Sequence, residues 1–373
     1  MFVKWLKLKN FRNYEECYTE FTPKFNLISG KNGQGKTNLV EAVMLCALTK
    51  SPRTSRDDDM RKDGSDFTDV ELCVERNFGD ITIRCRIDNQ NKKMFFVNTN
   101  ETKKMSDVFG NLVAVYFSPN DLKIVSGAPS DRRDFMDMDI SELSGTYYNL
   151  IQRYNKILEQ RNKLLKTIHN KQILESQIEI WNEQLASAAG HIVKTRKSFL
   201  NKITPPATNI MKYISKDADN LSISYVGSRG ETYEEIRSEI LSALRFNLDK
   251  DMELGYTTVG PHRDDIKFEL DDKDSKIYAS QGQQRTIALS VKIAELSVFA
   301  SELGENPILV LDDVFSELDY SRQKNLYEKF SDVQILMTGT NFRYRPKDDY
   351  QQIIVDGGKL KNKMKYCKNI NNN

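Results

Sequence analysis

The stretch FNLISGKNGQGKTNLVEAVMLCAL at residues 25–48 decides the fold of this chain. Residues 25–29 predict a buried strand, residues 30–37 a glycine loop and residues 38–48 an apolar helix. The loop matches the pattern G-x-x-x-x-G-K-[ST], in which successive backbone N–H groups converge on phosphate oxygens. A strand before the loop and a helix after it indicate a nucleotide-binding P-loop, whose residues are Gly30, Lys31, Asn32, Gly33, Gln34, Gly35, Lys36 and Thr37. We expect Lys36 to reach the β and γ phosphates and the Thr37 hydroxyl to bind Mg²⁺.

A second strand, PILVLDD at residues 307–313, ends in two acids. A P-loop site needs an acid at a strand end to hold Mg²⁺ through its water shell, and Asp312 is placed for this. Asp313 then activates or orients water, so we predict Lys36 and Asp313 as the catalytic residues. The alternative is that the two acids only begin a solvent-exposed loop after the strand. The presence of the P-loop residue Lys36 disfavours this alternative.

The segment SQGQQR at residues 280–285 begins a helix shortly before that strand. A small hydroxyl residue and a glycine at a helix N-terminus form an anion site, because free N–H groups and the helix dipole point at it. The competing interpretation is a simple N-cap, with Ser280 or Gln281 satisfying the first turn. The position upstream of the acidic strand favours the functional interpretation for Ser280, Gln281, Gly282 and Gln283.

The rest of the chain predicts a head and an arm. Short apolar runs between turns in residues 67–118 are typical of antiparallel strands. From Tyr147 to Ile168 and again from Leu174 to Phe199, apolar residues recur in steps of four and three, which predicts two helices of coiled-coil type. The prolines of TPP at 204–206 are expected to end the second helix. We therefore predict an α/β head of residues 1–128 and 216–373 and a helical arm of residues 129–215.

Composition excludes several classes of protein. The chain has 373 residues, 39% hydrophobic and 29% charged, and it contains no apolar run of about 18 residues that would span a membrane. Its first residues carry several lysines and do not resemble a signal peptide, so we expect a cytoplasmic protein without a membrane partner. Five cysteines without a CxxC pair argue against a disulfide framework or a zinc site.

The charges are unevenly distributed along the chain. The formal net charge is +2, made up of +3 in residues 1–128, +4 in residues 129–215 and −5 in residues 216–373. This distribution permits a polyanionic partner without proving one.

The order of these motifs carries a resemblance. A P-loop, then SQGQQR, then ILVLDD and SELD (316–319) resembles the ATP-binding-cassette heads of the SMC class, with signature motif, Walker B and D-loop in that order. Further strings narrow the resemblance to the RecF family of bacterial recombination mediators. They are LKNFRNY (8–14), SPRTSR (51–56), FSPNDL (117–122), GAPSDRRDFMD (127–137) and VGPHRDD (259–265).

The resemblance implies a function and a set of residue roles. It implies a protein of DNA repair and replication that binds ATP with Mg²⁺ and forms an ATP-dependent homodimer, into which the signature enters in trans. It places Arg12 and Asn13 near the adenosine and Ser316 and Asp319 in the D-loop. It implies binding of double-stranded and gapped DNA, and the partners RecR and RecO, which act together to load RecA at single-strand gaps.

Departures from the cassette pattern concern hydrolysis. Asp313 stands where transporters have Glu, no histidine follows the last strand, and the Q-loop glutamine is replaced by Asn120 or Asp121. A shorter carboxylate and no histidine predict weak ATPase activity, with ATP acting as a switch. Two alternatives, a transporter ATPase subunit and an SMC-like scaffold, are disfavoured because the arm is too long for the first and too short for the second.

Overall fold

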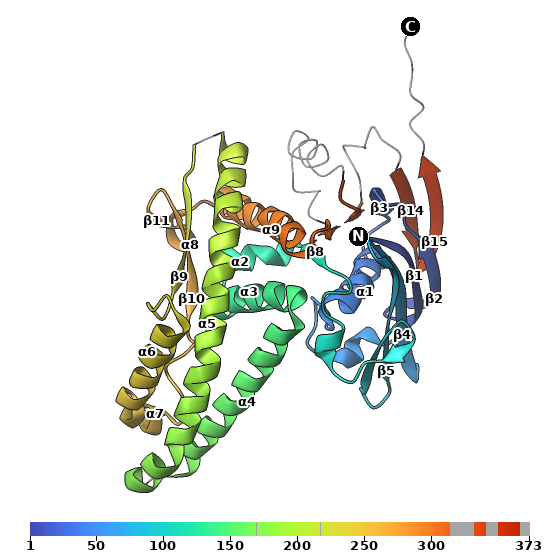
Figure 1. Cartoon of the computed structure of the whole chain (residues 1–373). Helices are drawn as coiled ribbons and strands as arrows, with labels where there is room; N and C mark the ends of the chain where they lie inside the picture. Colours follow the sequence, from blue (N-terminus) through green and yellow to red (C-terminus); the bar gives the residue numbers. More distant parts are fainter. Residues whose placement is uncertain (169, 217, 314–331, 341–349, 366–373) are drawn as a thin grey trace. The chain divides into compact units, whose positions relative to one another are not determined.

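The computed structural model describes residues 1–168, 170–216, 218–313, 332–340 and 350–365 (Figure 1). The chain divides into two compact units: unit 1 is Met1–Asp121 with Glu295–Asn373, and unit 2 is Leu122–Ala294. Residues 218–294 therefore lie in the same unit as the helical arm. The assignment of residues 1–128 and 216–373 to the head and of residues 129–215 to the arm stays a prediction.

The centre of unit 1 is a six-stranded sheet in the order β15-β14-β3-β13-β12-β8. Its strands are β15 (Lys359–Lys365), β14 (Tyr350–Asp356), β3 (Phe25–Ser29), β13 (Ile335–Gly339), β12 (Ile308–Asp312) and β8 (Ala114–Phe117). All neighbours are parallel except β14 and β15. Every residue of β3, β12 and β13 is buried, as expected for parallel strands covered on both faces. The prediction of antiparallel pairing was wrong for β8, which pairs parallel with β12.

The second sheet of unit 1 is antiparallel, in the order β2-β1-β4-β5-β6-β7. Its strands are β2 (Tyr14–Glu20), β1 (Phe2–Phe11), β4 (Phe67–Arg76), β5 (Gly79–Asp88), β6 (Lys93–Val97) and β7 (Asn100–Glu101). In β5 the buried residues alternate with partly exposed ones from Ile81 to Ile87, the pattern of a sheet with one face on the core. The antiparallel strands predicted from β4 to β6 are confirmed.

Helix α1 (Lys36–Leu48) joins the two sheets of unit 1. It contacts β12 and β13 of the central sheet and β1, β4 and β5 of the antiparallel sheet. Because both sides of the helix are covered, it is apolar around most of its surface rather than along one stripe. The predicted strand–loop–helix of residues 25–48 is confirmed, and it lies in the core of unit 1. Among the described residues, short 3₁₀ helices lie at η1 (Asp57–Met60), η2 (Met105–Asp107) and η3 (Pro119–Leu122).

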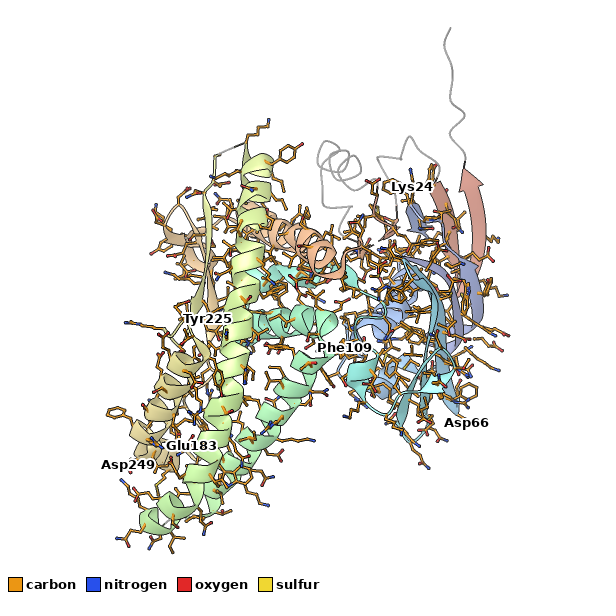
Figure 2. The ribbon with its side chains drawn as sticks, viewed as in Figure 1. Lys24, Asp66, Phe109, Glu183, Tyr225 and Asp249 are labelled. Atoms are coloured by element: carbon orange, nitrogen blue, oxygen red, sulfur yellow. The ribbon has the colours of Figure 1, made fainter. Side chains whose placement is uncertain are left out.

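Unit 2 combines helices with a three-stranded antiparallel sheet in the order β11-β10-β9. The strands are β9 (Leu221–Val226), β10 (Asp265–Leu270) and β11 (Lys273–Asp274). The helices are α2 (Lys123–Ser126), α3 (Pro129–Leu143), α4 (Gly145–Thr167), α5 (Lys171–Ser215), α6 (Tyr233–Phe246), α7 (Leu248–Leu254), α8 (Ser275–Tyr278) and α9 (Gln281–Leu303), the last of which ends in unit 1. Side chains of Glu183 on α5, Asp249 on α7 and Tyr225 on β9 mark these elements in Figure 2.

The predicted helical hairpin is confirmed as α4 and α5, which pack side by side (Figure 1). The apolar residues that recur in steps of four and three form a seam between the two helices. They are buried at Tyr147, Tyr154, Leu165, Leu174 and Ile178. Helix α4 begins where the Ser144 hydroxyl accepts a hydrogen bond from the Tyr147 N–H, which is an N-cap.

The prediction that prolines end the second helix was wrong. Helix α5 continues through Pro205 and Pro206 to Ser215, although each proline removes one backbone donor. Beyond them Ala207 and Met211 are fully buried, and the Thr208 hydroxyl donates to the Leu221 carbonyl of β9. Packing of this last part of α5 against β9 thus outweighs the local preference of the prolines.

Among the helices that the structure describes, none is long and apolar enough to cross a bilayer. Within the described residues, the cysteines are buried free thiols: Cys17, Cys46, Cys73 and Cys85.

Candidate nucleotide-binding site

The glycine loop connects β3 to α1 at the carboxyl edge of the central sheet. Two of its glycines are required by their surroundings. A Cβ at Gly30 would lie 2.4 Å from the carbonyl oxygen of Val355, and a Cβ at Gly35 would lie 2.7 Å from the side-chain amide of Asn13. Gly35 also has φ 112°, a conformation that side chains other than that of glycine rarely adopt. Glycine is therefore required at Gly30 by a close backbone approach and at Gly35 by its left-handed φ and the neighbouring Asn13 side chain.

The Lys36 ammonium group lies within this loop. Its Nζ donates to the carbonyl oxygens of Gly30 at 2.9 Å and Lys31 at 3.0 Å, and the residue is 5% exposed. Helix α1 begins here with Gly35 as N-cap and has no acidic residue in its first turn. Free N–H groups, the helix dipole and a buried cation therefore favour an anion at this point.

Asp312, the last residue of β12, is surrounded by hydroxyl donors. Its Oδ1 accepts from Thr37 Oγ1 at 3.0 Å and from Thr338 Oγ1 at 2.7 Å, and its Oδ2 accepts from the Tyr116 hydroxyl at 3.1 Å. Burial, and then the charge of Asp312, raise the pKa of the Tyr116 phenol far above its usual range, so the phenol remains a donor. Thr37 and Asp312, each predicted to hold Mg²⁺, are thus hydrogen-bonded to each other, while the contacts of Thr338 and Tyr116 with Asp312 were not predicted.

Asp313 follows immediately in an unusual backbone conformation. Its φ is 58°, in the left-handed region that aspartate tolerates better than most residues. Its N–H donates to Thr338 Oγ1 at 2.9 Å, so Thr338 links both acids to β13. The sharp change of direction after β12 places the two neighbouring carboxylates differently, since Asp312 is buried and Asp313 is partly exposed.

The oxygen atoms of Thr37 and Asp312 fit a magnesium ion. Mg²⁺ is usually held by one or two protein oxygens together with phosphates and waters, and the Thr37 hydroxyl donates its proton to Asp312 and so keeps its lone pairs. In the described part of the chain, no group of three or more His, Cys, Asp or Glu side chains could hold a metal ion by itself. A metal at this edge would therefore depend on the bound nucleotide for further ligands.

Arg12 and Asn13 form the tight turn between β1 and β2, beside the glycine loop. Arg12 has φ 52°, and Asn13 Nδ2 donates to the Gln34 carbonyl at 2.8 Å. Asn38 on α1 donates in turn to Asn13 Oδ1 at 2.9 Å. The structure thus brings together the loop and the two residues that the resemblance places near the adenosine.

Glu41 is a central residue of the site that sequence reasoning missed. Glu41 is fully buried on α1, and its carboxylate accepts two hydrogen bonds from Arg12. It also accepts one from Arg53 Nη1 at 3.1 Å and one from the Ser51 hydroxyl at 2.5 Å. It therefore connects the β1–β2 turn and the loop after α1 to the P-loop helix. The signal in the sequence was a lone acid within the apolar run NLVEAVMLCAL.

Asn120 and Asp121, one of which is expected to replace the Q-loop glutamine, lie in the short helix η3, which follows β8. Asp121 Oδ2 accepts from the Ser118 N–H at 2.6 Å and from the Ser118 hydroxyl at 3.0 Å, whereas Asn120 is exposed. Which of Asn120 and Asp121 takes the glutamine's place stays open.

The predicted signature lies in unit 2, at the start of α9. Ser280 and Gln283 form reciprocal hydrogen bonds: the Ser280 N–H donates to Gln283 Oε1 at 3.0 Å, and the Gln283 N–H donates to Ser280 Oγ at 3.3 Å. This is a capping box, so the N-cap interpretation is correct for the local structure. Gln281 and Gly282 are exposed. The D-loop residues Ser316 and Asp319 lie outside the described residues.

His262, in the string VGPHRDD, makes its contacts inside unit 2. Its Nδ1 lies 2.6 Å from the Tyr154 hydroxyl and its Nε2 lies 3.1 Å from the Thr257 carbonyl. Asp264 Oδ2 accepts from the Tyr225 hydroxyl at 2.5 Å. These contacts stabilise the interior of unit 2.

Comparisons with known proteins identify a family for this chain. The model of the family "RecF/RecN/SMC N terminal domain" matches residues 2–343. The chain is 42% identical to the DNA replication and repair protein RecF of Alkaliphilus oremlandii over 344 residues, which are 91% of this chain and 93% of the relative. It is 38% identical to the protein of the same name from Clostridium botulinum over 365 residues, 97% of this chain and 100% of the relative.

Solved structures give the same result. A structure described as the recombination mediator protein RecF-ATP in the RecFOR pathway has a TM-score of 0.90 and 33% identity, and the match covers 97% of both chains. The Smc head domain of Pyrococcus furiosus, bound to the C-terminal domain of ScpA, has a TM-score of 0.56 at 16% identity and supports the fold alone.

The fold and the site define an ATP-binding-cassette ATPase head of the SMC class, as the resemblance implied. The chain belongs to the RecF family of DNA replication and repair proteins.

Proposed function

We propose that this protein is an ATP-switched DNA-binding protein of recombinational repair and replication-fork maintenance. The observation that carries the proposal is the P-loop site itself, in which Lys36, Thr37 and Asp312 converge, in a chain that matches relatives named RecF over nearly its full length. ATP binds at the glycine loop of residues 30–37, with Arg12 and Asn13 at the adenosine side.

Magnesium is the second cofactor, held by Thr37 and by Asp312 through its water shell. It neutralises charge on the phosphates when bound. Asp313 orients or deprotonates the attacking water, and Lys36 stabilises negative charge on the phosphates. The carboxylate of Asp313 is one methylene shorter than that of Glu and no histidine assists it, so hydrolysis is weak and serves to end a bound state.

The ATP-bound state is a homodimer. Each chain has one P-loop and one signature, and in the SMC class the signature of one copy completes the nucleotide site of the other. Ser280, Gln281, Gly282 and Gln283 therefore act in trans, with the D-loop residues Ser316 and Asp319 in the same interface. In a two-fold symmetric dimer both copies contribute the same surface, so the two composite sites form together.

DNA binds through its phosphates. Residues 1–128 and 129–215 carry net charges of +3 and +4, whereas residues 216–373 carry −5. Phosphate binding needs no base-specific contact and weakens steeply with salt. We infer double-stranded and gapped DNA as ligands, RecR and RecO as partners and RecA as the recombinase loaded at the gap. The protein acts in the cytoplasm.

Fluorescence anisotropy with a gapped duplex tests the proposal. The affinity should be much higher with ATP than with ADP, and it should fall steeply as salt rises. The variant Lys36→Met should bind DNA equally with either nucleotide. Equal affinities of the wild type with ATP and ADP, or affinity independent of salt, would contradict the switch.

A further inference from the structure

The Tyr116 hydroxyl contacts the acid that is expected to hold the metal. Asp312 Oδ2 accepts from Tyr116 at 3.1 Å, while Oδ1 accepts from Thr37 at 3.0 Å and Thr338 at 2.7 Å. A carboxylate has about four lone-pair sites. Three hydroxyls therefore leave about one site, on Oδ2, for a further donor such as a metal-bound water.

The contact follows from the register of the central sheet. Strand β8 runs parallel to β12, and Tyr116 lies opposite Val310. Asp312 is two residues beyond Val310, so its side chain points to the same face of the sheet as that of Tyr116. The Tyr116 side chain is long enough for its hydroxyl to reach Asp312 from the neighbouring strand. The parallel pairing of β8 thus delivers the phenol to the carboxylate.

The other two donors act on one oxygen of the carboxylate. Thr37 and Thr338 both donate to Oδ1, so they restrain rotation about the Cβ–Cγ bond through that oxygen alone. A donor on Oδ2 adds a second restraint through the other oxygen. Tyr116 supplies that donor from a ring whose position is set by a strand in the sheet.

We propose that Tyr116 is a positioning residue for the divalent cation of this site. Its hydroxyl adds to the restraint on rotation of the Asp312 carboxylate, so that Oδ1 stays on Thr37 and the remaining lone pair of Oδ2 would be available to a metal-bound water. The proposal rests on the proposed function, because it assumes that Mg²⁺ and ATP bind here. Removal of a group that supports the direct ligands of a metal typically costs about 10- to 100-fold in metal affinity, and we expect the lower end here because Asp312 reaches the cation through water.

The test uses the full chain with the substitution Tyr116→Phe, which removes only the hydroxyl. Affinity for a fluorescent ATP analogue is measured across a Mg²⁺ titration and also in EDTA. The Mg²⁺ concentration at half-maximal effect should rise about tenfold, while the affinity in EDTA stays unchanged. The matched control is Tyr18→Phe, because the Tyr18 hydroxyl also donates to a carboxylate, Glu20 Oε1 at 3.0 Å, but lies on the antiparallel sheet.

Each outcome decides the proposal. An unshifted Mg²⁺ midpoint in Tyr116→Phe would overturn it. An equal loss of affinity in EDTA and in Mg²⁺ would show that Tyr116 supports the loop rather than the metal, and would also overturn it. Circular dichroism melting checks that the variant is folded. A wild type that binds no ATP would remove the proposed function as well, whereas normal wild-type binding with an unshifted variant would remove only this inference.

Discussion

The Thr37 hydroxyl donates to the Asp312 carboxylate at 3.0 Å, although 275 positions separate the two residues in the chain. They meet because β3 and β12 are both parallel neighbours of β13, so their carboxyl ends share one edge of the sheet. Thr338 of β13 lies between them and donates to the same oxygen of Asp312. The site is thus assembled from three strand ends.

The Lys36→Met variant should bind ATP at least tenfold more weakly while remaining folded. The substitution removes the ammonium group that lies within the glycine loop, and a hydrogen bond to a charged group contributes about 1.5–3 kcal/mol. Titration with a fluorescent ATP analogue measures the loss. Lys24→Met is the control, because Lys24, labelled in Figure 2, is exposed and precedes β3. Unchanged affinity in Lys36→Met would refute the P-loop assignment.

Substitution of the two neighbouring acids should have different effects. Asp313→Asn should lower the hydrolysis rate by about 10²- to 10⁴-fold and preserve ATP-bound dimers, since an amide cannot take a proton from water. Asp312→Asn should weaken Mg²⁺-dependent ATP binding itself. Phosphate release and nucleotide titration of both variants measure the difference. Equal losses of binding in the two variants would contradict this division of roles.

Ser280→Arg should block the ATP-dependent dimer and leave ATP binding by the monomer nearly intact. Arginine would occupy the position where the signature is expected to meet the nucleotide of the second copy. Loss of the N-cap costs only about 1 kcal/mol, so the variant should fold. Light scattering with ATP gives the oligomeric state, and Ser222→Arg, at an exposed position of β9, is the control. A dimeric Ser280→Arg protein would exclude the composite site.

His262→Gln should change how stability depends on pH. Burial, the largest cause, lowers the pKa of His262 to about 4, whereas the unfolded value is about 6.5. The unfolded chain therefore binds more protons between these values, and the His262 contribution to the free energy of unfolding is present above pH 6.5 and lost as pH falls towards 4. Each pKa unit corresponds to about 1.4 kcal/mol. The His262→Gln variant should lack this increase of the free energy of unfolding between about pH 4 and 6.5.

Asp264 provides the opposite contribution and hence the control. Burial raises its pKa from 3.8 to about 6, so its stabilising contribution is present below pH 3.8 and lost as pH rises to 6. In the wild type the two contributions oppose each other over nearly the same range. Urea unfolding from pH 4 to 7 should show stability falling with pH in His262→Gln and rising with pH in Asp264→Asn. Parallel pH profiles of the two variants would refute the assignment of these pKa values.

Much of the site could be predicted because its parts are short contiguous patterns. The glycine loop, its preceding strand and its following helix are adjacent in the chain, and the acids of β12 end an unbroken apolar run. The α4–α5 seam is likewise periodic within each helix. Such patterns reflect local backbone geometry and burial, which the neighbouring residues determine.

Other features depended on residues far apart in the chain. The parallel direction of β8, the continuation of α5 through Pro205 and Pro206, and the contacts of Glu41 with Arg12 and Arg53 exist only after distant segments pack. Local propensity for a short apolar strand is the same in either pairing direction, and a proline's cost of about 3 kcal/mol is offset only by tertiary burial. The amino-acid sequence thus determined the chemical groups of the nucleotide site, while the tertiary structure decided which distant hydroxyl and guanidinium groups hold them, because hydrogen bonds and ion pairs require proximity in space.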